Sequence, residues 1–157
     1  MLALVLAARV LIGDPLPELE LTPLEGEGPV TLPADVHGHP IVIDFFATWC
    51  QPCREALPAL ERLRARFEPA HVEFITISID APSARAEVER FVREHKLQSR
   101  VLLDPKRAAF DRMGVRKLPT TYIVDPEGVV RRINNGYGSG YEARMARWLK
   151  KLMGPAQ

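Results

Sequence analysis

The stretch "IVIDFFATWCQPC", residues 41–53, leads from a run of apolar residues into the two cysteines of the chain. Residues 41–46 are β-branched or aromatic except for one aspartate, a composition typical of a strand covered on both faces. Cys50 and Cys53 follow, separated by two residues. Thiols at this spacing serve a metal site, a haem attachment, a structural disulfide or a redox couple. The rest of the sequence distinguishes among these four uses.

Helical and strand periodicities continue on both sides of this stretch. Apolar residues at helical spacing predict a helix over residues 50–67, and residues 18–21 and 29–32 flank a glycine-containing turn and predict a hairpin. Further predicted elements are strands at 72–79 and 101–103, an amphipathic helix at 83–96, a short helix ending at Gly114, a hairpin within 115–133 and an amphipathic terminal helix at 141–153. The alternation predicts an α/β fold with a largely parallel sheet, which the antiparallel hairpins make mixed, flanked by helices.

Composition indicates a single domain and excludes some partners. A chain of 157 residues, 46% of them hydrophobic, buries most of its apolar surface in one domain, here residues 1–157. The formal net charge is +1 and the basic residues are dispersed, which argues against a nucleic-acid partner. The apolar start "MLALVLAARVLI" is shorter than the roughly 20 residues of a membrane-spanning helix, so no stable membrane insertion is expected. It also lacks a basic n-region, so we predict a packed strand or helix there rather than a cleaved leader. Separately, we expect the protein to be a monomer.

The sequence context argues against three of the four uses of the cysteine pair. A zinc site needs two further ligands, and the candidates His37 and His39 precede a strand that separates them from the cysteines by roughly 20 Å. Covalent haem requires a histidine directly after the second cysteine, where this chain has Arg54. Two cysteines are too few for the disulfide framework of a small secreted domain. A redox pair remains, and no metal or cofactor is expected.

The position of each cysteine on the predicted helix assigns its role. Cys50 lies at the helix N-terminus, where unpaired N–H groups and the helix dipole stabilise negative charge and lower the pKa of a thiol. Cys50 is therefore predicted to be the attacking thiolate. Cys53 lies one turn inside the helix, and we predict that it stays a thiol until a mixed disulfide forms and then attacks the Cys50 sulfur.

These features resemble the TlpA/ResA-type thiol-disulfide oxidoreductases of the thioredoxin fold. The resemblance rests on "IVIDFFATWCQPC", on Pro58 five residues after the second cysteine, on "KLPTTYIVDPEG" at 117–128 and on "GDPLPELEL" at 13–21. It covers roughly residues 13–152 and includes an added helix and strand at 80–104 that plain thioredoxin lacks. It implies a thioredoxin-like fold with an N-terminal hairpin and a strand–helix insertion.

The resemblance also implies a set of substrate-binding residues. Pro119 is expected to be a cis-proline facing the disulfide, and Leu118 to offer its backbone to an extended substrate peptide. Trp49 is expected beside the nucleophile. Pro52, between the cysteines, offers neither a charge nor an N–H donor that would further stabilise the Cys50 thiolate, so we predict a reductant of protein disulfides.

The same resemblance suggests partners and a compartment. The group commonly works in the bacterial cell envelope, receives electrons from a membrane thiol carrier and reduces apocytochrome or other protein disulfides. We expect the same here, with a cytoplasmic protein served by a thioredoxin reductase as the alternative. A peroxiredoxin-like peroxidase would share the extended fold, but Ile43 and Ala47 occupy the proline and threonine positions of the P-x-x-x-T-x-x-C pattern. A non-catalytic binding or chaperone module, with a groove near Pro119, is a further alternative.

The acidic residues near the cysteines depart from the pattern of the group. A glutamate usually lies three residues after the second cysteine, but this chain has Ala56 there, and Glu55 is about 100° away around the helix. Asp44, in contrast, lies within the apolar strand, where thioredoxin keeps a buried aspartate. A carboxylate on a strand covered on both faces is costly, and burial raises its pKa towards neutrality. Asp44 is therefore predicted to accept the proton of Cys53.

Overall fold

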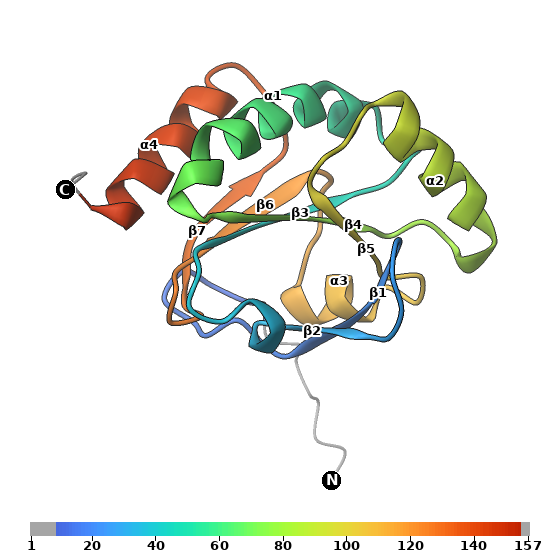
Figure 1. The fold of residues 1–157 in the computed structure, drawn as a ribbon, viewed down its shortest axis with the longest axis horizontal. Helices are drawn as coiled ribbons and strands as arrows, with labels where there is room; N and C mark the ends of the chain where they lie inside the picture. Colours follow the sequence, from blue (N-terminus) through green and yellow to red (C-terminus); the bar gives the residue numbers. More distant parts are fainter. Residues whose placement is uncertain (1–8, 155–157) are drawn as a thin grey trace, which may run out of the picture.

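The computed structural model of the protein describes residues 9–154 (Figure 1). The strand or helix predicted from "MLALVLAARVLI" falls largely on residues 1–8, outside this range. Residues 9–12 form neither a helix nor a strand, and Leu11 and Ile12 are each 57% exposed, so the prediction is wrong for these residues. No helix among residues 9–154 has the length and apolar character needed to cross a membrane.

Within residues 9–154, seven strands form one sheet in the order β2-β1-β5-β4-β3-β6-β7, and four α-helices pack against it (Figure 1). The strands are β1 (Leu19–Pro23), β2 (Val30–Leu32), β3 (Ile41–Phe46), β4 (Glu73–Ser78), β5 (Arg100–Leu103), β6 (Thr120–Val124) and β7 (Val130–Asn135). The helices are α1 (Gln51–Phe67), α2 (Arg85–Glu94), α3 (Ala108–Met113) and α4 (Tyr141–Met153), with short 3-10 helices at Ala34–Val36, Glu68–Ala70 and Pro82–Ala84. The elements predicted between residues 18 and 153 are all present, close to their expected bounds.

The sheet is mixed, as predicted, but it is not largely parallel. Within the described chain only β3–β4 and β4–β5 are parallel pairs, while β1–β2, β1–β5, β3–β6 and β6–β7 are antiparallel. Alternating strands and helices give parallel pairs only where each helix returns the chain to the starting edge of the sheet. Helices α1 and α2 do so, whereas α3 does not, because β6 begins at the edge where β5 ends.

Helices α1, α2 and α4 lie on one side of the sheet and α3 lies on the other (Figure 1). Phe46 of β3 packs against Phe91 of α2, with ring centroids 5.6 Å apart, and Phe45 packs against Phe110 of α3 at 6.2 Å. Successive side chains of a strand point to opposite faces, so these contacts show that both faces of β3 are covered. All residues of β3 are buried, which confirms the strand predicted from its composition.

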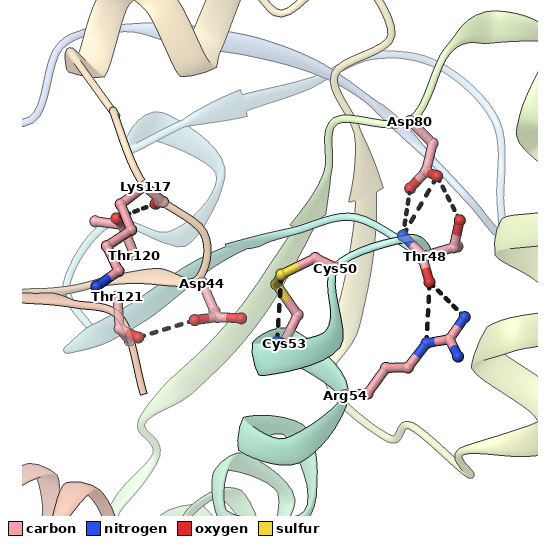
Figure 2. Close-up of a disulfide and its surroundings, with 9 residues drawn as sticks. All are labelled: Asp44, Thr48, Cys50, Cys53, Arg54, Asp80, Lys117, Thr120 and Thr121. Atoms are coloured by element: carbon pink, nitrogen blue, oxygen red, sulfur yellow. Dashed lines mark hydrogen bonds between the residues drawn. A yellow bond between two sulfur atoms is a disulfide. The ribbon is translucent and has the colours of Figure 1, made fainter. Parts of the chain in front are cut away.

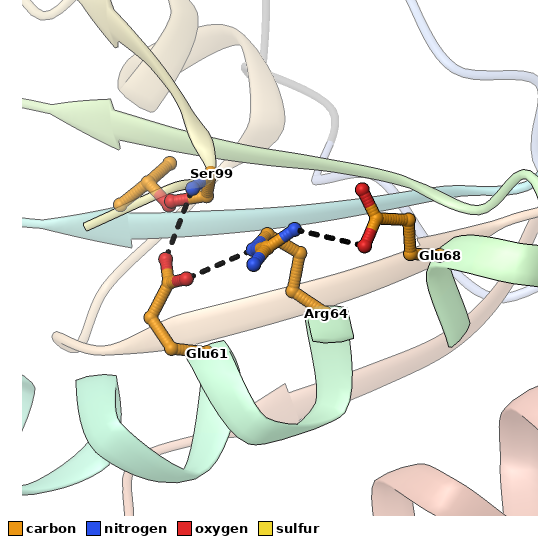
Figure 3. A network of polar contacts seen from close by, with 5 residues as sticks. Glu61, Arg64, Glu68 and Ser99 are labelled. Atoms are coloured by element: carbon orange, nitrogen blue, oxygen red, sulfur yellow. Dashed lines mark hydrogen bonds and ion pairs between the residues drawn. The ribbon is translucent and has the colours of Figure 1, made fainter. Parts of the chain in front are cut away.

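The added elements α2 and β5 join the N-terminal hairpin to the central strands, since β5 lies between β1 and β4. At the edge of the sheet opposite the cysteines, Glu61 of α1 accepts a hydrogen bond from the Ser99 amide at 3.0 Å and another from Arg64 at 2.9 Å (Figure 3). Arg64 also lies 3.9 Å from Glu68. This network ties α1 to the turn that leads into β5.

Candidate active site

Cys50 and Cys53 form a disulfide where the chain passes from β3 to α1. Cys50 is the N-cap residue of α1, and its sulfur accepts a hydrogen bond from the Cys53 amide at 3.3 Å (Figure 2). The amide donor and the helix N-terminus both favour negative charge on the Cys50 sulfur. Cys50 is 6% exposed and Cys53 is 0% exposed, so Cys50 is the cysteine that another protein can reach first.

The disulfide lies at the edge of the sheet where three parallel strands end. Because β3, β4 and β5 run in the same direction, the segments that follow them meet at this edge. Asp80 follows β4, and Asp104 follows β5 and accepts hydrogen bonds from the first turn of α3. Pro119 directly precedes β6, whose first residue pairs with Phe45 near the end of β3. The sheet register therefore brings the proline loop and two acidic residues to the edge that carries the cysteines.

The loop that carries Cys50 is held from both sides (Figure 2). Asp80 accepts hydrogen bonds from the Thr48 amide at 3.0 Å and from the Thr48 hydroxyl at 2.5 Å, and Ser78 donates a further one to Asp80 at 2.7 Å. From the other side, Arg54 donates two hydrogen bonds to the Thr48 carbonyl, at 3.0 and 2.7 Å. The end of β4 and the first turn of α1 thus fix the backbone two residues before Cys50.

Asp44 lies between β6 and the disulfide (Figure 2). It is 1% exposed, and its Oδ1 accepts a hydrogen bond from the Thr121 hydroxyl at 2.8 Å, while the other carboxylate oxygen points toward the cysteines in Figure 2. Burial raises the pKa of Asp44 from 3.8 to about 7, and the hydrogen bond from Thr121 partly opposes this rise. The predicted burial of Asp44 is confirmed, and the direction of the pKa shift is the predicted one.

The residues implied to bind substrate lie at the same edge. Trp49 is 63% exposed beside the disulfide, and Pro52 is exposed in the first turn of α1. The Leu118–Pro119 peptide bond is cis, and the Pro119 carbonyl accepts a hydrogen bond from the Gly136 amide at 2.7 Å. Within residues 9–154 no hydrogen bond is formed by the Leu118 amide or carbonyl.

Other polar residues considered in the sequence lie away from the disulfide. Glu55 is exposed and pairs with Gln51 at 3.4 Å, while the buried position next to it belongs to Ala56, as the helical spacing predicts. His37 and His39 precede β3, at the opposite edge of the sheet. In the described part of the chain, no group of three histidine, cysteine or acidic side chains could hold a metal ion.

Five residues of the site were missed by the sequence analysis: Thr48, Arg54, Asp80, Thr121 and Tyr141. Asp80 alone has a local signal, because it follows an apolar strand at the edge where the cysteines were expected. Thr121 and Tyr141 approach Asp44 only through the pairing of β6 with β3 and the packing of α4, so nothing in their own neighbourhoods marks them.

Comparison with known proteins places the chain in a family. The model of the AhpC/TSA family matches residues 12–133. The "Thiol-disulfide oxidoreductase ResA" of Geobacillus thermodenitrificans is 30% identical over 128 residues, which cover 81% of this chain and 71% of that protein. The "Thioredoxin-like protein YneN" of Bacillus subtilis is 32% identical over 124 residues, covering 79% of this chain and 71% of the relative.

Solved structures show the same fold. The structure of a putative thiol:disulfide interchange protein DsbE from Chlorobium tepidum covers 92% of this chain and 99% of its own, with a TM-score of 0.84 and 24% identity. At this identity the likeness concerns the thioredoxin fold alone. With the family match, the ResA relatives and the Cys50–Cys53 pair taken together, the chain belongs to the AhpC/TSA family and is a thioredoxin-fold thiol-disulfide oxidoreductase of the ResA type.

Proposed function

We propose that the protein reduces disulfide bonds in other proteins by cycling between the Cys50–Cys53 dithiol and disulfide. The observation that carries the proposal is the asymmetry of the pair. The Cys50 sulfur accepts an amide hydrogen bond at the N-terminus of α1, whereas Cys53 is completely buried behind it. A stabilised thiolate on the more exposed cysteine, with a completely buried thiol behind it, suits attack followed by internal resolution.

The reaction proceeds in two exchange steps that conserve electrons. The Cys50 thiolate attacks one sulfur of the substrate disulfide, forms a mixed disulfide and releases the other substrate sulfur as a thiolate, which takes up a proton. Cys53 then loses its proton and attacks the Cys50 sulfur, which releases the second substrate thiolate and leaves the Cys50–Cys53 disulfide. A dithiol donor reduces this disulfide again and returns the protein to its starting state.

In this scheme Asp44 takes the proton of Cys53 during the second step. The support is its place between β6 and the disulfide and its pKa of about 7, which allows both protonation states at neutral pH. Glu55 is exposed on the outer side of α1 and is not positioned for this role.

Trp49, Pro52, Leu118 and Pro119 form the substrate-binding surface in this proposal. An extended peptide would pair with the unpartnered Leu118 backbone and lie against the exposed Trp49 ring. Pro119→Ala should then slow turnover of protein disulfides much more than turnover of a small disulfide. Equal slowing with both substrates would exclude this surface.

Insulin reduction in the presence of dithiothreitol tests the activity. Wild type should accelerate the reaction, and Cys50→Ala should abolish it. Cys53→Ala should still attack and should accumulate mixed disulfides, because no thiol remains to resolve them. No acceleration by wild type would instead favour a binding module, and loss of the first step in both variants would refute the assignment of roles.

The direction of electron flow is testable by equilibration with glutathione. Pro52 adds neither a charge nor a donor beside the Cys50 sulfur, so the disulfide form should be favoured and the dithiol should be a good reductant. A potential as high as about −120 mV, that of a strong disulfide-forming oxidant, would contradict this direction.

The proposed setting is the bacterial cell envelope, with a membrane thiol carrier as donor and a monomeric protein as the active form. The support is the resemblance to the TlpA/ResA group, and a cytoplasmic protein served by a thioredoxin reductase is the competing assignment. Fractionation of cells that express Cys53→Ala, combined with isolation of the trapped mixed disulfides, identifies compartment and client together. Clients trapped only in the cytoplasm would overturn the envelope assignment.

A further inference from the structure

A chain of hydroxyl groups runs from Asp44 to the start of α4. The Thr121 hydroxyl donates to Asp44 Oδ1 at 2.8 Å and lies 3.0 Å from the Tyr141 hydroxyl. The three residues come from β3, β6 and α4, and each is 1% exposed. The β3–β6 register places Asp44 and Thr121 directly opposite each other.

This arrangement matches what a buried acid that gains and loses a proton requires. While Asp44 is ionised, Thr121 donates to it and Tyr141 donates to Thr121. A hydroxyl group both donates and accepts, so when Asp44 is protonated the chain can reverse, with Asp44 donating to Thr121 and Thr121 donating to Tyr141. Each of the three oxygen atoms keeps a hydrogen bond within the chain in either state, and only the Tyr141 proton changes its acceptor, which limits the penalty of an unsatisfied buried group.

The titratable groups that face Asp44 are few. The cysteines approach it from α1 and Tyr141 from α4, and behind Tyr141 lie Tyr137 and Arg144. Burial, then the Asp44 carboxylate, raise the pKa of Tyr141 above its ordinary value, so its phenol stays protonated at neutral pH. No ion pair involves Asp44 anywhere in residues 9–154. The hydroxyl chain is therefore the polar support of the carboxylate in the part of the protein described.

We propose that Thr121 and Tyr141 are positioning residues for the proton transfer: they hold the Asp44 carboxylate with one oxygen directed toward the cysteines and stabilise its ionised form. The proposal rests on the proposed reductase function and on the role of Asp44 in it. The further proposal is that Thr121 and Tyr141 set the pH range in which Asp44 accepts the proton of Cys53.

Thr121→Val tests the first link, because valine keeps the shape of threonine and removes the donor. We expect it to raise the pKa of Asp44, followed by NMR of its carboxyl carbon, by about one unit. The pH profile of mixed-disulfide resolution should move to higher pH by the same amount, while the first attack by Cys50 keeps its rate. Thr121→Ser, which retains the hydroxyl, should restore both the pKa and the profile.

Tyr141→Phe tests the second link and should shift the pKa and the profile in the same direction by a smaller amount. Tyr137→Phe is the matched control: its ring lies 5.3 Å from that of Tyr141, but Tyr137 is 39% exposed and does not belong to the hydroxyl chain. It should leave both measurements at their wild-type values.

Three results distinguish failure of this proposal from failure of the proposed function. The proposal is overturned if Thr121→Val and Tyr141→Phe leave unchanged both the pKa of Asp44 and the pH profile of mixed-disulfide resolution. This holds even if wild type reduces insulin. Resolution slowed equally at all pH values, with an unchanged pKa, would show a merely structural role and would also overturn it. A wild type that does not reduce insulin would refute the reductase function, and the pKa measurements would still decide whether the hydroxyl chain stabilises the Asp44 carboxylate.

Discussion

At the residue scale, Asp44 is a carboxylate that its surroundings disfavour. It lies on a strand whose residues are all buried, and within residues 9–154 only Thr121 donates a hydrogen bond to it. Burial accordingly raises its pKa to about 7. Ala56 occupies the helical position that would otherwise offer an acid to Cys53. Asp44 is therefore the buried acid nearest to the cysteines along the chain, and one of its carboxylate oxygens points toward them in Figure 2.

Asp44→Asn should slow the resolution of mixed disulfides and leave the first attack by Cys50 largely intact. Asparagine has nearly the shape of aspartate but cannot accept a proton, and general base catalysis contributes about 10²- to 10⁴-fold to a rate. Rapid-mixing measurements of both steps from pH 6 to 8 test this, with Glu55→Gln as the control for an exposed acid. Wild-type resolution across this range would mean that water or Glu55 carries the proton.

At the element scale, the loop between β3 and α1 depends on β4. The Asp80 carboxylate accepts hydrogen bonds from the amide and the hydroxyl of Thr48. The residues that follow β4 therefore hold the loop that follows the neighbouring strand β3. Arg54 holds the same residue from α1. The cysteine pair is therefore positioned by contacts from three elements and not by its own short loop.

Asp80→Ala should lower the free energy of unfolding by about 1–3 kcal/mol, because it leaves the Thr48 amide without its partner. It should also slow alkylation of Cys50 in the reduced protein, since the loop that presents the thiolate loses its support. Asp104→Ala is the matched control: this buried carboxylate follows the next strand and binds the amides of Ala109 and Phe110. It should destabilise the protein without changing the alkylation rate. Equal rates of Cys50 alkylation in the two variants would show that Asp80 does not position the loop that carries Cys50.

The network at the opposite edge predicts a change in stability without a change in activity. Glu61→Ala removes the acceptor of the Ser99 amide, which belongs to a residue only 7% exposed, and should cost about 1–3 kcal/mol (Figure 3). Glu68→Ala removes a carboxylate that is 72% exposed and 3.9 Å from Arg64, and should change stability by no more than about 0.5 kcal/mol. Urea unfolding measures the free energy of unfolding of both variants. Similar decreases in the two variants would show that the hydrogen bond from the Ser99 amide to Glu61 does not contribute the expected stability.

At the scale of the whole molecule, Asp44 makes stability depend on pH. Its pKa is 3.8 in the unfolded chain and about 7 in the folded protein, so the folded state holds a proton that the unfolded state releases between these values. The free energy of unfolding should therefore fall as pH rises from 4 to above 7, by up to about 4 kcal/mol from this group.

The oxidised Asp44→Asn variant isolates this contribution. It should be more stable than wild type above pH 7, with an advantage that shrinks towards zero near pH 4, where wild-type Asp44 is protonated in the folded state. Urea unfolding of both proteins from pH 4 to 8 measures the difference. A difference that does not change with pH would show that Asp44 is not buried with a raised pKa.

Most of the fold and the centre of the site follow from short-range patterns in the sequence. Continuous apolar character marked β3, and helical spacing marked α1. The position of Cys50 at the helix N-terminus, with Cys53 one turn further on, assigned the two cysteine roles. The apolar setting of Asp44 in "IVIDFF" predicted its burial. Each of these inferences depends on residues within a few positions of one another, because strand and helix periodicities act over that range.

What only the tertiary structure decided depends on contacts between distant segments. The sequence predicted a mixed sheet, but the predominance of antiparallel pairs was decided by the structure, in which β6 begins at the edge where β5 ends and runs antiparallel to β3. Asp80 reaches Thr48 across 32 positions, and Thr121 reaches Asp44 across 77. No local pattern encodes such pairs, because strand register and helix packing bring them together only when the whole core assembles.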